Sequence, residues 1–327
     1  MASRLGFFLS LALVAFCLIF LMLCPAQAAE SACAGLKLCA EMIVPSLFPF
    51  LTLSALMQRI GVPQALSRRF EGVMRALFGV SGSGCVPFVL GLTGGYPVGA
   101  AAVAELVRCG VVSPGEGERM LTFVNNTGPA FIVGAAGAGV FRSPAVGLLL
   151  YLSHALSAVC VGVLFSKRGF DSASFAPTAP DRRQGLFTAL PAAVKSAASS
   201  AVNICAFVVF FSVIRGMLER TGLFSLCVEL VEHVFGVSGV FAGALISGVL
   251  ELGGGIAAMQ GLAPAPPNLA LASFILGFGS LSVHCQTLSV IEGTDMKCAR
   301  HFAGRIIAGA ISALITYILA SAACFFS

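Results

Sequence analysis

The stretch Leu90–Ala102, LGLTGGYPVGAAA, places four glycines, a proline and a tyrosine inside a long apolar run. Glycine costs a helix about 1 kcal/mol relative to alanine, and proline costs about 3 kcal/mol. Pro97 has no N–H group and disfavours helical dihedral angles at Tyr96. Backbone groups left unpaired in lipid cost several kcal/mol each, so such a break persists only where protein or a watery cavity satisfies them. The stretch therefore predicts a binding site in a membrane protein, with a kinked, glycine-rich packing face as the alternative.

The composition of the 327-residue chain supports the membrane class. Hydrophobic residues make up 58% of it, charged residues make up only 10%, and the mean hydropathy is +0.98. Several windows run for twenty residues without a charge, which is the length that crosses about 30 Å of hydrocarbon. The net charge of +5 comes from basic residues in short loops, which indicate topology rather than a nucleic-acid partner. We expect an integral, multi-pass membrane protein.

Residues 1–29 form an N-terminal segment with two open interpretations. The apolar run Leu5–Leu23 is followed by Pro25–Ala28, which resembles a signal-peptidase site. A cleaved signal peptide and a first transmembrane helix both fit this pattern. We favour the retained helix, because the apolar run is long for a signal peptide.

The next segments combine apolar runs with polar or helix-breaking residues. Ala34–Met57 is a second span, and its two prolines, Pro45 and Pro49, predict a kink or a break. Arg59–Gly82 has the pattern of an amphipathic helix that lies in the plane of the membrane interface.

A second polar break interrupts the span Met120–Phe141, where the sequence NNTGP occupies 125–129. Polar side chains at that depth are costly, so they usually face a cavity or a partner helix. The span that follows, Ala145–Phe165, carries His154 as its one ionisable group. We expect this histidine to be a hydrogen-bonding group in helix packing rather than a ligand.

The second half of the chain repeats the first. The sequence FGVSG at 78–82 recurs at 235–239, an offset of 157 residues. At this offset the glycine-rich break corresponds to ELGGG at 251–255. The NNTGP break corresponds, after a six-residue deletion, to GFGSLSVHCQ at 277–286. A shared order of breaks predicts an internal repeat.

A hydrophilic segment rich in proline, serine and charge divides the two halves. We therefore expect a first repeat over 30–166, a cytoplasmic linker over 167–185 and a second repeat over 186–327.

The distribution of charge predicts how the halves are oriented. If Cys85–Val107 crossed the membrane fully, the basic linker would lie outside, against the positive-inside rule. If Cys85–Val107 and Val240–Leu262 are re-entrant hairpins, every basic loop lies inside, including Lys297, Arg300 and Arg305. The hairpins then enter from opposite faces. We predict an all-α fold of two inverted repeats with re-entrant hairpins and broken helices, the architecture of a secondary transporter.

The motifs, taken as a set, resemble those of a known family. They are VPSLFPF (44–50), GGYPVGA (94–100), NNTGPAFIVG (125–134), LELGGG (250–255) and GFGSLSVHCQ (277–286). Over roughly residues 35–320 the chain resembles the sporulation integral membrane proteins with paired nucleoside-recognition (Gate) domains. Members include the stage V protein that moves dipicolinic acid across the outer forespore membrane, and the Gate fold is similar to half of a concentrative nucleoside transporter.

The resemblance implies transport of dipicolinic acid or a related solute, at the cell membrane or the outer forespore membrane. It also implies the concentrative nucleoside transporter fold for the whole chain. One departure concerns the residue after the glutamate of ELGGG, where the family pattern has a polar residue. This departure leaves ion coupling in question.

The breaks predict the substrate site. A broken helix points free N–H groups at the cavity, and two such N-termini suit the carboxylates of a small anion. Tyr96 and Phe278 are placed to stack on a planar ring. The residues that we expect to bind the substrate are Gly94, Gly95, Tyr96, Asn125, Asn126, Thr127, Ser282 and Gln286.

Two ionisable residues are predicted to couple transport to a proton or a sodium ion. Glu251 is the only acid within a broken run of the second half, and His284 lies in the later break. An intramembrane ionisable residue is a functional candidate by default. A hydrogen bond that only supports helix packing is the alternative for each.

Other functions remain open at this stage. A nucleoside or nucleobase cation symporter would use the same scaffold, with paired acids and amides for the ribose. A non-transporting structural membrane protein of spore assembly would tolerate alanine and leucine at the polar breaks. No nucleophile–base pair or phosphate loop is visible, so we expect no enzyme, no metal site and no cofactor beyond the coupling ion. The expected partners are a small-molecule anion and the lipid bilayer, with the oligomeric state left open.

Overall fold

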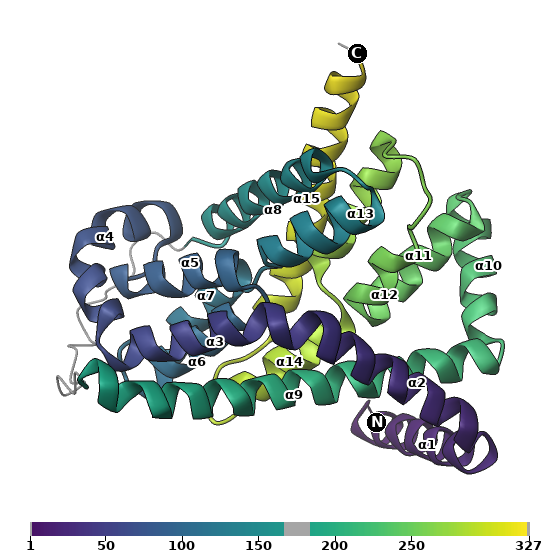
Figure 1. Ribbon diagram of the computed structural model, residues 1–327, viewed down its shortest axis with the longest axis horizontal. Coiled ribbons are helices and arrows are strands. Elements are labelled where there is room, and N and C mark those ends of the chain that lie inside the picture. Colours follow the sequence, from purple (N-terminus) through teal and green to yellow (C-terminus); the bar gives the residue numbers. More distant parts are fainter. Residues whose placement is uncertain (1, 167–183, 326–327) are drawn as a thin grey trace.

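The computed structural model describes residues 2–166 and 184–325, and within these ranges the chain is helical, without strands (Figure 1). The linker expected over 167–185 lies outside the described residues, except for Gln184 and Gly185 at its end.

The N-terminal part is one bent helical path. Helix α1 (Ala2–Leu23) and helix α2 (Pro25–Leu38) meet at a bend of 104°. The path continues through a π-helical turn, η1 (Cys39–Ile43), into α3 (Val44–Arg59). The predicted span is confirmed as helical, but its prolines do not break it. Pro49 lies inside α3. The irregularity is instead the π-helical turn η1, which precedes Pro45, and such turns are common where a helix cannot form a regular hydrogen bond.

A long pair of helices forms one side of the molecule. Helix α9 (Leu186–Arg220) packs along α2 and α3 and runs in the opposite direction (Figure 1). Its 35 residues correspond to about 52 Å, enough to cross a bilayer with a tilt. The approach is close at Gly35, where an added Cβ would lie 2.8 Å from the Oγ of Ser212.

The FGVSG repeat marks two equivalent corners of the fold. Helix α4 (Val62–Phe78) and helix α10 (Leu223–Phe235) both end at a glycine with positive φ, Gly79 at 62° and Gly236 at 64°. Only glycine adopts this left-handed conformation without strain, and it closes the last helical turn. The chain then bends by 91° after α4 and by 118° after α10. The amphipathic helix predicted over Arg59–Gly82 corresponds to α4.

The elements after these corners follow the same order in both halves. Each half has a hairpin of two short helices, then a helix broken in the middle, then a last long helix. In the first half the hairpin is α5 (Cys85–Gly94) with α6 (Val98–Arg108), and a short 3-10 turn, η2 (Gly82–Gly84), precedes it. The broken helix is α7 (Pro114–Val124) with the π-helical η3 (Ala130–Val140), and the last long helix is α8 (Pro144–Leu164). In the second half the hairpin is α11 (Gly239–Leu250) with α12 (Leu252–Ala257). The broken helix is α13 (Pro266–Phe278) with α14 (Leu281–Ile291), and the last long helix is α15 (Ala299–Phe325).

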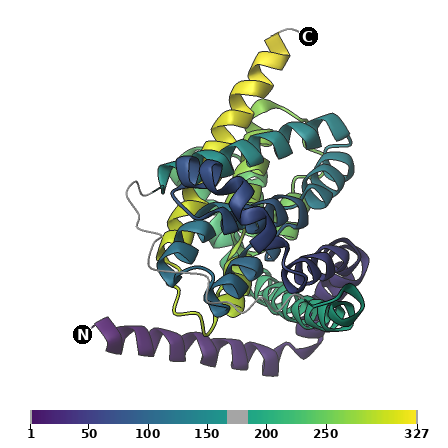
Figure 2. The same ribbon diagram turned by 90° about the vertical axis from the view of Figure 1, so that its left-hand side faces the viewer.

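Helix α15 is the central packing element. It lies against α13, α8 and α7, so it contacts broken helices of both halves. Figure 2 shows α15 passing through the bundle and projecting at one end, while α1 lies along the opposite side. One sequence prediction is corrected here. Arg305 is not part of a basic loop: it lies in α15 and is fully buried.

The apolar helices make this a multi-pass integral membrane protein. In the described ranges, four helices are long and apolar enough to cross a membrane, and up to seven spans result if each strongly bent pair counts as one. Helices α4 and α10 lie at opposite ends of the α3–α9 pair (Figure 1). This arrangement is the one that inverted repeats require, and the inversion itself stays a prediction.

Membrane topology tests the inversion. We expect a cysteine at Ser113, before α7, to react only from the cytoplasmic side, and a cysteine at Ser225, in α10, to react only from the outer side. The exposed native cysteines Cys33, Cys109, Cys160 and Cys227 are replaced first. Reaction of both positions from the same side, with an impermeant maleimide on intact cells, would contradict the inverted-repeat arrangement.

Candidate functional site

Two chain breaks of the first half meet backbone to backbone. Gly95, between α5 and α6, has a φ of 79°, and a Cβ added to it would lie 2.7 Å from the backbone nitrogen of Gly128, between α7 and η3. No other residue fits this combination of left-handed backbone and close approach. The glycine-rich stretch therefore serves to bring the hairpin tip onto the break of α7.

The hairpin packs equally closely on the end of α7. A Cβ on either Gly91 or Gly99 would clash with the carbonyl oxygen of Val124. Both arms of the hairpin thus pack against the last turn of α7, and the spacing of the two glycines across the break is what permits it. The close packing expected for a glycine-rich face is therefore present, and the substrate-binding role of the stretch stays a prediction.

The NNTGP break is held by hydrogen bonds to two neighbouring helices, α14 and α8, and to the last turn of α7 itself. The Nδ2 of Asn125 donates to the Oγ1 of Thr287 at 2.8 Å, and the Nδ2 of Asn126 donates to the carbonyl of Phe123 at 2.7 Å. The backbone N–H of Thr127 donates to the Nε2 of His154 at 3.1 Å. His154 thus has the packing role that we expected, and it satisfies a backbone group that the break sets free.

The corresponding break in α13–α14 receives hydrogen bonds from the first half. The Oγ1 of Thr127 donates to the carbonyl of Leu276 at 2.8 Å, and the hydroxyl of Tyr96 reaches the same oxygen at 3.4 Å. The carbonyl of Gly277 accepts two hydrogen bonds from the guanidinium of Arg305, one of them from Nε at 3.0 Å. These groups satisfy the carbonyls at the C-terminal end of α13.

Glu251 caps the short helix that follows the second-half hairpin break. One carboxylate oxygen accepts from the N–H of Gly253 at 2.8 Å, and the other accepts from the N–H of Gly254 at 2.6 Å. The guanidinium of Arg215, on α9, lies next to Gly254. The side chain of Glu251 is 8% exposed and borders the cavity described below. The N-terminus of α12 is therefore occupied by the carboxylate of Glu251.

This capping corrects part of the predicted anion site. We expected two N-termini of broken helices to face the substrate, but at α12 the N–H groups of Gly253 and Gly254 already bind Glu251. A substrate carboxylate would compete with this capping carboxylate at α12. The first-half hairpin has no such competitor, because Pro97 at the start of α6 provides no side-chain cap.

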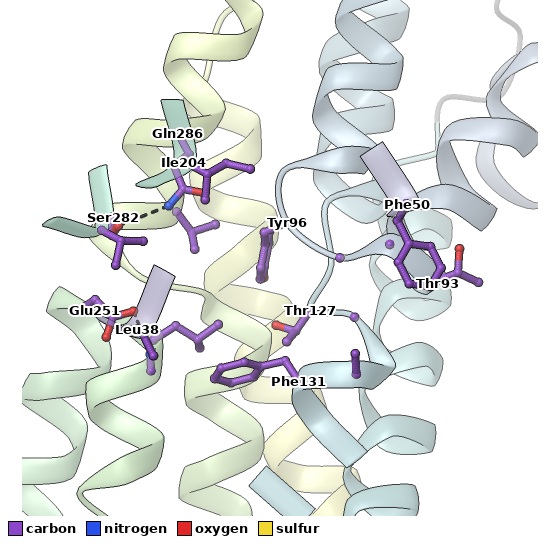
Figure 3. Close-up of a pocket in the computed structure, with 18 residues that line it drawn as sticks. Leu38, Phe50, Thr93, Tyr96, Thr127, Phe131, Ile204, Glu251, Ser282 and Gln286 are labelled. Atoms are coloured by element: carbon purple, nitrogen blue, oxygen red, sulfur yellow. Dashed lines mark hydrogen bonds between the residues drawn. The ribbon is translucent and has the colours of Figure 1, made fainter. Parts of the chain in front are cut away.

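A cavity lies where the breaks of the two halves face each other (Figure 3). The cavity is partly open to the outside. Tyr96 and Thr127 of the first half border it, and Glu251, Ser282 and Gln286 of the second half lie across from them (Figure 3). The Nε2 of Gln286 donates to the Oγ of Ser282 at 3.3 Å. The remaining lining residues are mostly apolar or glycine: Leu38, Phe50, Thr93, Gly94, Gly95, Gly128, Ala130, Phe131, Ile204, Val208, Leu252, Gly253 and Val283.

Seven of the predicted residues therefore line one cavity. They are Gly94, Gly95, Tyr96, Thr127, Ser282, Gln286 and Glu251. Asn125 and Asn126 are fully buried behind it, where they hold the α7 break in place.

The aromatic and histidine residues of the later break lie elsewhere. Phe278, expected to stack on a substrate ring, stacks instead on Phe274, with ring centroids 6.0 Å apart. The Nδ1 of His284 lies 3.2 Å from the Nε2 of His301, whose own Nδ1 lies 3.0 Å from the carbonyl of Leu121. Only an N–H donor can face that carbonyl, so the Nδ1 of His301 donates to Leu121. Neither Phe278 nor His284 borders the cavity.

Sequence reasoning missed two groups of residues. The apolar wall formed by Leu38, Phe50, Ile204 and Val208 comes from α2, α3 and α9, where the prolines at 45 and 49 indicated a kink but no part of a site. Arg305 could have been found from the sequence, since a charge six residues into a long apolar helix is costly in a membrane and therefore indicates a function.

Comparisons with known proteins define the class of protein first. A solved structure of CNTnw, a concentrative nucleoside transporter, in an outward-facing state has a TM-score of 0.50 and 15% identity, and the match covers 99% of this chain and 86% of that one. At that identity the likeness concerns the fold alone. The chain has the all-α membrane fold of the concentrative nucleoside transporters, built on several apolar helices and broken helix pairs.

A curated relative gives the more particular likeness. The sporulation integral membrane protein YlbJ of Bacillus subtilis (strain 168) is 28% identical over 319 residues, covering 90% of this chain and 78% of the relative. No family model matches the chain. The resemblance that the five motifs predicted is confirmed over nearly the whole chain, and the protein is a transporter-like integral membrane protein similar to YlbJ.

The hydrogen bonds of Asn126 generate a prediction. In Asn126→Leu the carbonyl of Phe123 loses its donor and Arg305 loses an acceptor that lies 3.2 Å from its Nη1. Leaving such buried groups unpaired costs about 1–3 kcal/mol, so we expect a protein that inserts but melts at a lower temperature and no longer accumulates solute. Thermal melting in detergent and uptake into vesicles measure both effects.

Asn268→Leu is the matched control, because its amide bonds the carbonyl of Ala263 at an exposed site away from the breaks. Wild-type melting and accumulation in Asn126→Leu would show that the NNTGP break is only a kink.

Proposed function

We propose that the protein is a secondary transporter of a small anionic solute, with dipicolinate as the best-fitting substrate. The observation that carries the proposal is the cavity between the halves, where hydroxyl and amide groups from two broken helices converge beside an aromatic ring. Transporters of this architecture bind their substrates at such meeting points near the membrane midplane. The likeness to a sporulation protein supports a solute that is moved during spore formation.

The chemistry of the lining suits a planar ring that carries hydrogen-bond acceptors. Tyr96, Phe50 and Phe131 offer faces or edges for aromatic contacts, which favour offset or edge-on packing. Ser282 offers a hydroxyl donor and Gln286 an amide N–H for carboxylate oxygens, while the hydroxyl proton of Thr127 is donated to the carbonyl of Leu276. A pocket that is mostly apolar with a few convergent polar groups is typical of small-molecule sites.

Glu251 is our first candidate for the residue that couples transport to a proton or a sodium ion, and His284 is the second. The carboxylate of Glu251 borders the cavity and caps α12, so a change in its protonation or ion binding would alter both the charge of the cavity and the stability of the hairpin. Coupled transport requires such a link between the charge of a site and the stability of a structural element. His284 lies behind the cavity, and its Nε2 has no hydrogen-bond partner among the described residues.

Uptake by the purified protein tests the proposal. We expect proteoliposomes that contain the full chain to accumulate radiolabelled dipicolinate, and excess unlabelled dipicolinate to compete better than uridine or uracil. Better competition by uridine would favour the nucleoside symporter, which needs the same hydroxyl and amide groups for a neutral ribose. Absence of any solute flux, in vesicles shown to contain folded protein, would favour the structural membrane protein of spore assembly.

Replacement of Glu251 tests the coupling role. In Glu251→Gln the group is fixed neutral, and an amide provides one acceptor oxygen for the two N–H groups that the carboxylate binds. We expect loss of concentrative uptake under an imposed proton or sodium gradient, while exchange of internal for external solute persists. Loss of one capping bond is expected to cost about 1 kcal/mol of stability.

Ser238→Ala is the matched control, because it removes a capping bond to the N–H of Phe241 at α11 without changing any acid. If Glu251→Gln concentrates solute at the wild-type rate and with an unchanged gradient dependence, Glu251 is only a helix cap.

A further inference from the structure

Arg305 is a buried charge that the proposed function does not yet use. It lies six residues into α15, about 9 Å along the helix axis from its start, and its side chain has 0% exposure. Burying an ionised group inside a protein costs several kcal/mol unless partners compensate it. Intramembrane arginines with this degree of burial usually mark a pathway or a ligand.

The partners of Arg305 are all formally neutral. Its Nε and Nη2 donate to the carbonyl of Gly277, its Nη1 donates to the Oδ1 of Asn126 at 3.2 Å, and its guanidinium carbon lies 5.7 Å from the ring centroid of Tyr96. Among the described residues, no carboxylate forms an ion pair with it. The nearest compensation is the C-terminal end of α13, which carries only about half a negative charge.

The position of Arg305 connects it to the cavity. Its three partners belong to the three breaks that meet there: Tyr96 to the hairpin, Asn126 to the α7 break and Gly277 to the end of α13. Tyr96 itself lines the cavity, so the guanidinium stands one side chain behind the wall. Glu251, the acid of the cavity, is engaged by the N–H groups of α12 and lies beside Arg215. It therefore does not serve as the counter-ion of Arg305.

We propose that Arg305 is the residue that makes the cavity selective for anions. This inference rests on the proposed function and assigns the charge of its substrate to one residue. A fixed positive charge one side chain away attracts a carboxylate in a low-dielectric site and is not neutralised by any described acid. A neutral solute of the same shape gains nothing from it. The substrate supplies the counter-ion that the described residues do not.

Asn126→Asp is the decisive variant. It is isosteric, and it places a carboxylate oxygen on the hydrogen bond that Arg305 already makes with Oδ1. The variant thus gives the arginine an ion-pair partner, but its second carboxylate oxygen replaces the Nδ2 that donates to the carbonyl of Phe123. The melting temperature of the empty protein serves to show that the variant is folded, because the new ion pair and the lost hydrogen bond to Phe123 act on stability in opposite directions. We expect dipicolinate to bind about tenfold more weakly or worse, because the new carboxylate screens the charge that attracts it.

Three pyridine ligands serve as charge probes on the detergent-purified full chain: dipicolinate (two negative charges), picolinate (one) and pyridine-2,6-dicarboxamide (none). Calorimetry on wild type is expected to rank them in that order. In Asn126→Asp the dicarboxamide should bind within about threefold of its wild-type affinity. The differences in affinity between the three ligands should then shrink only because the two anions bind more weakly. Arg305→Lys should keep the wild-type ranking, since it keeps the charge.

Asn203→Asp is the control for an added carboxylate. Asn203 is half-buried on α9 and bonds Ser289 at 3.0 Å, without contact to Arg305. It should keep the wild-type ranking. An Asn126→Asp protein that retains the preference for dipicolinate, or an Asn203→Asp protein that loses it equally, overturns the role of Arg305 while the proposed function stands. A wild-type protein that binds uridine but no pyridine carboxylate overturns the proposed function and, with it, the anion selectivity.

Discussion

The need to satisfy backbone groups inside the membrane governs this structure. Each break in an apolar helix frees N–H and carbonyl groups that lipid cannot bind. The protein meets this need by placing the breaks against one another. Gly95 packs on Gly128, Thr127 and Tyr96 bind the last carbonyls of α13, and Glu251 binds the free N–H groups of α12. The breaks of the two halves thus stabilise each other, and neither half provides all of these partners alone.

The same constraint produces the cavity. Polar groups that converge to satisfy broken helices remain in one place, and the space between them is lined by both halves. Helices α2, α3 and α9 supply the apolar wall behind. A site built at such a junction responds to movement of either half, which is the property that alternating access needs. Charge is distributed unevenly around the site, with Glu251 held at its own helix and Arg305 without an acidic partner among the described residues.

The sequence predicted the location of the breaks well, because glycine, proline and adjacent asparagines are strong signals in an apolar run. It predicted Tyr96, Thr127, Ser282, Gln286 and Glu251 as neighbours, and these residues line one cavity. It did not predict which residues line the cavity and which stand behind it, since that depends on rotations of helices about their axes. Asn126 and His284 illustrate this limit. Arg305 was interpreted as a basic loop residue that indicates membrane topology. Its burial depends on where α15 begins relative to its neighbours, and no local pattern encodes that.

The central claim is that a small carboxylate binds where the broken helices of the two halves meet. A crystal structure with 4-bromodipicolinate tests it most directly, because the anomalous signal of bromine locates the ligand directly. The account predicts a peak in the cavity, with the ligand ring beside Tyr96 and a carboxylate within hydrogen-bonding distance of Ser282 or Gln286. A bromine peak at any other position, with this cavity empty, would contradict it.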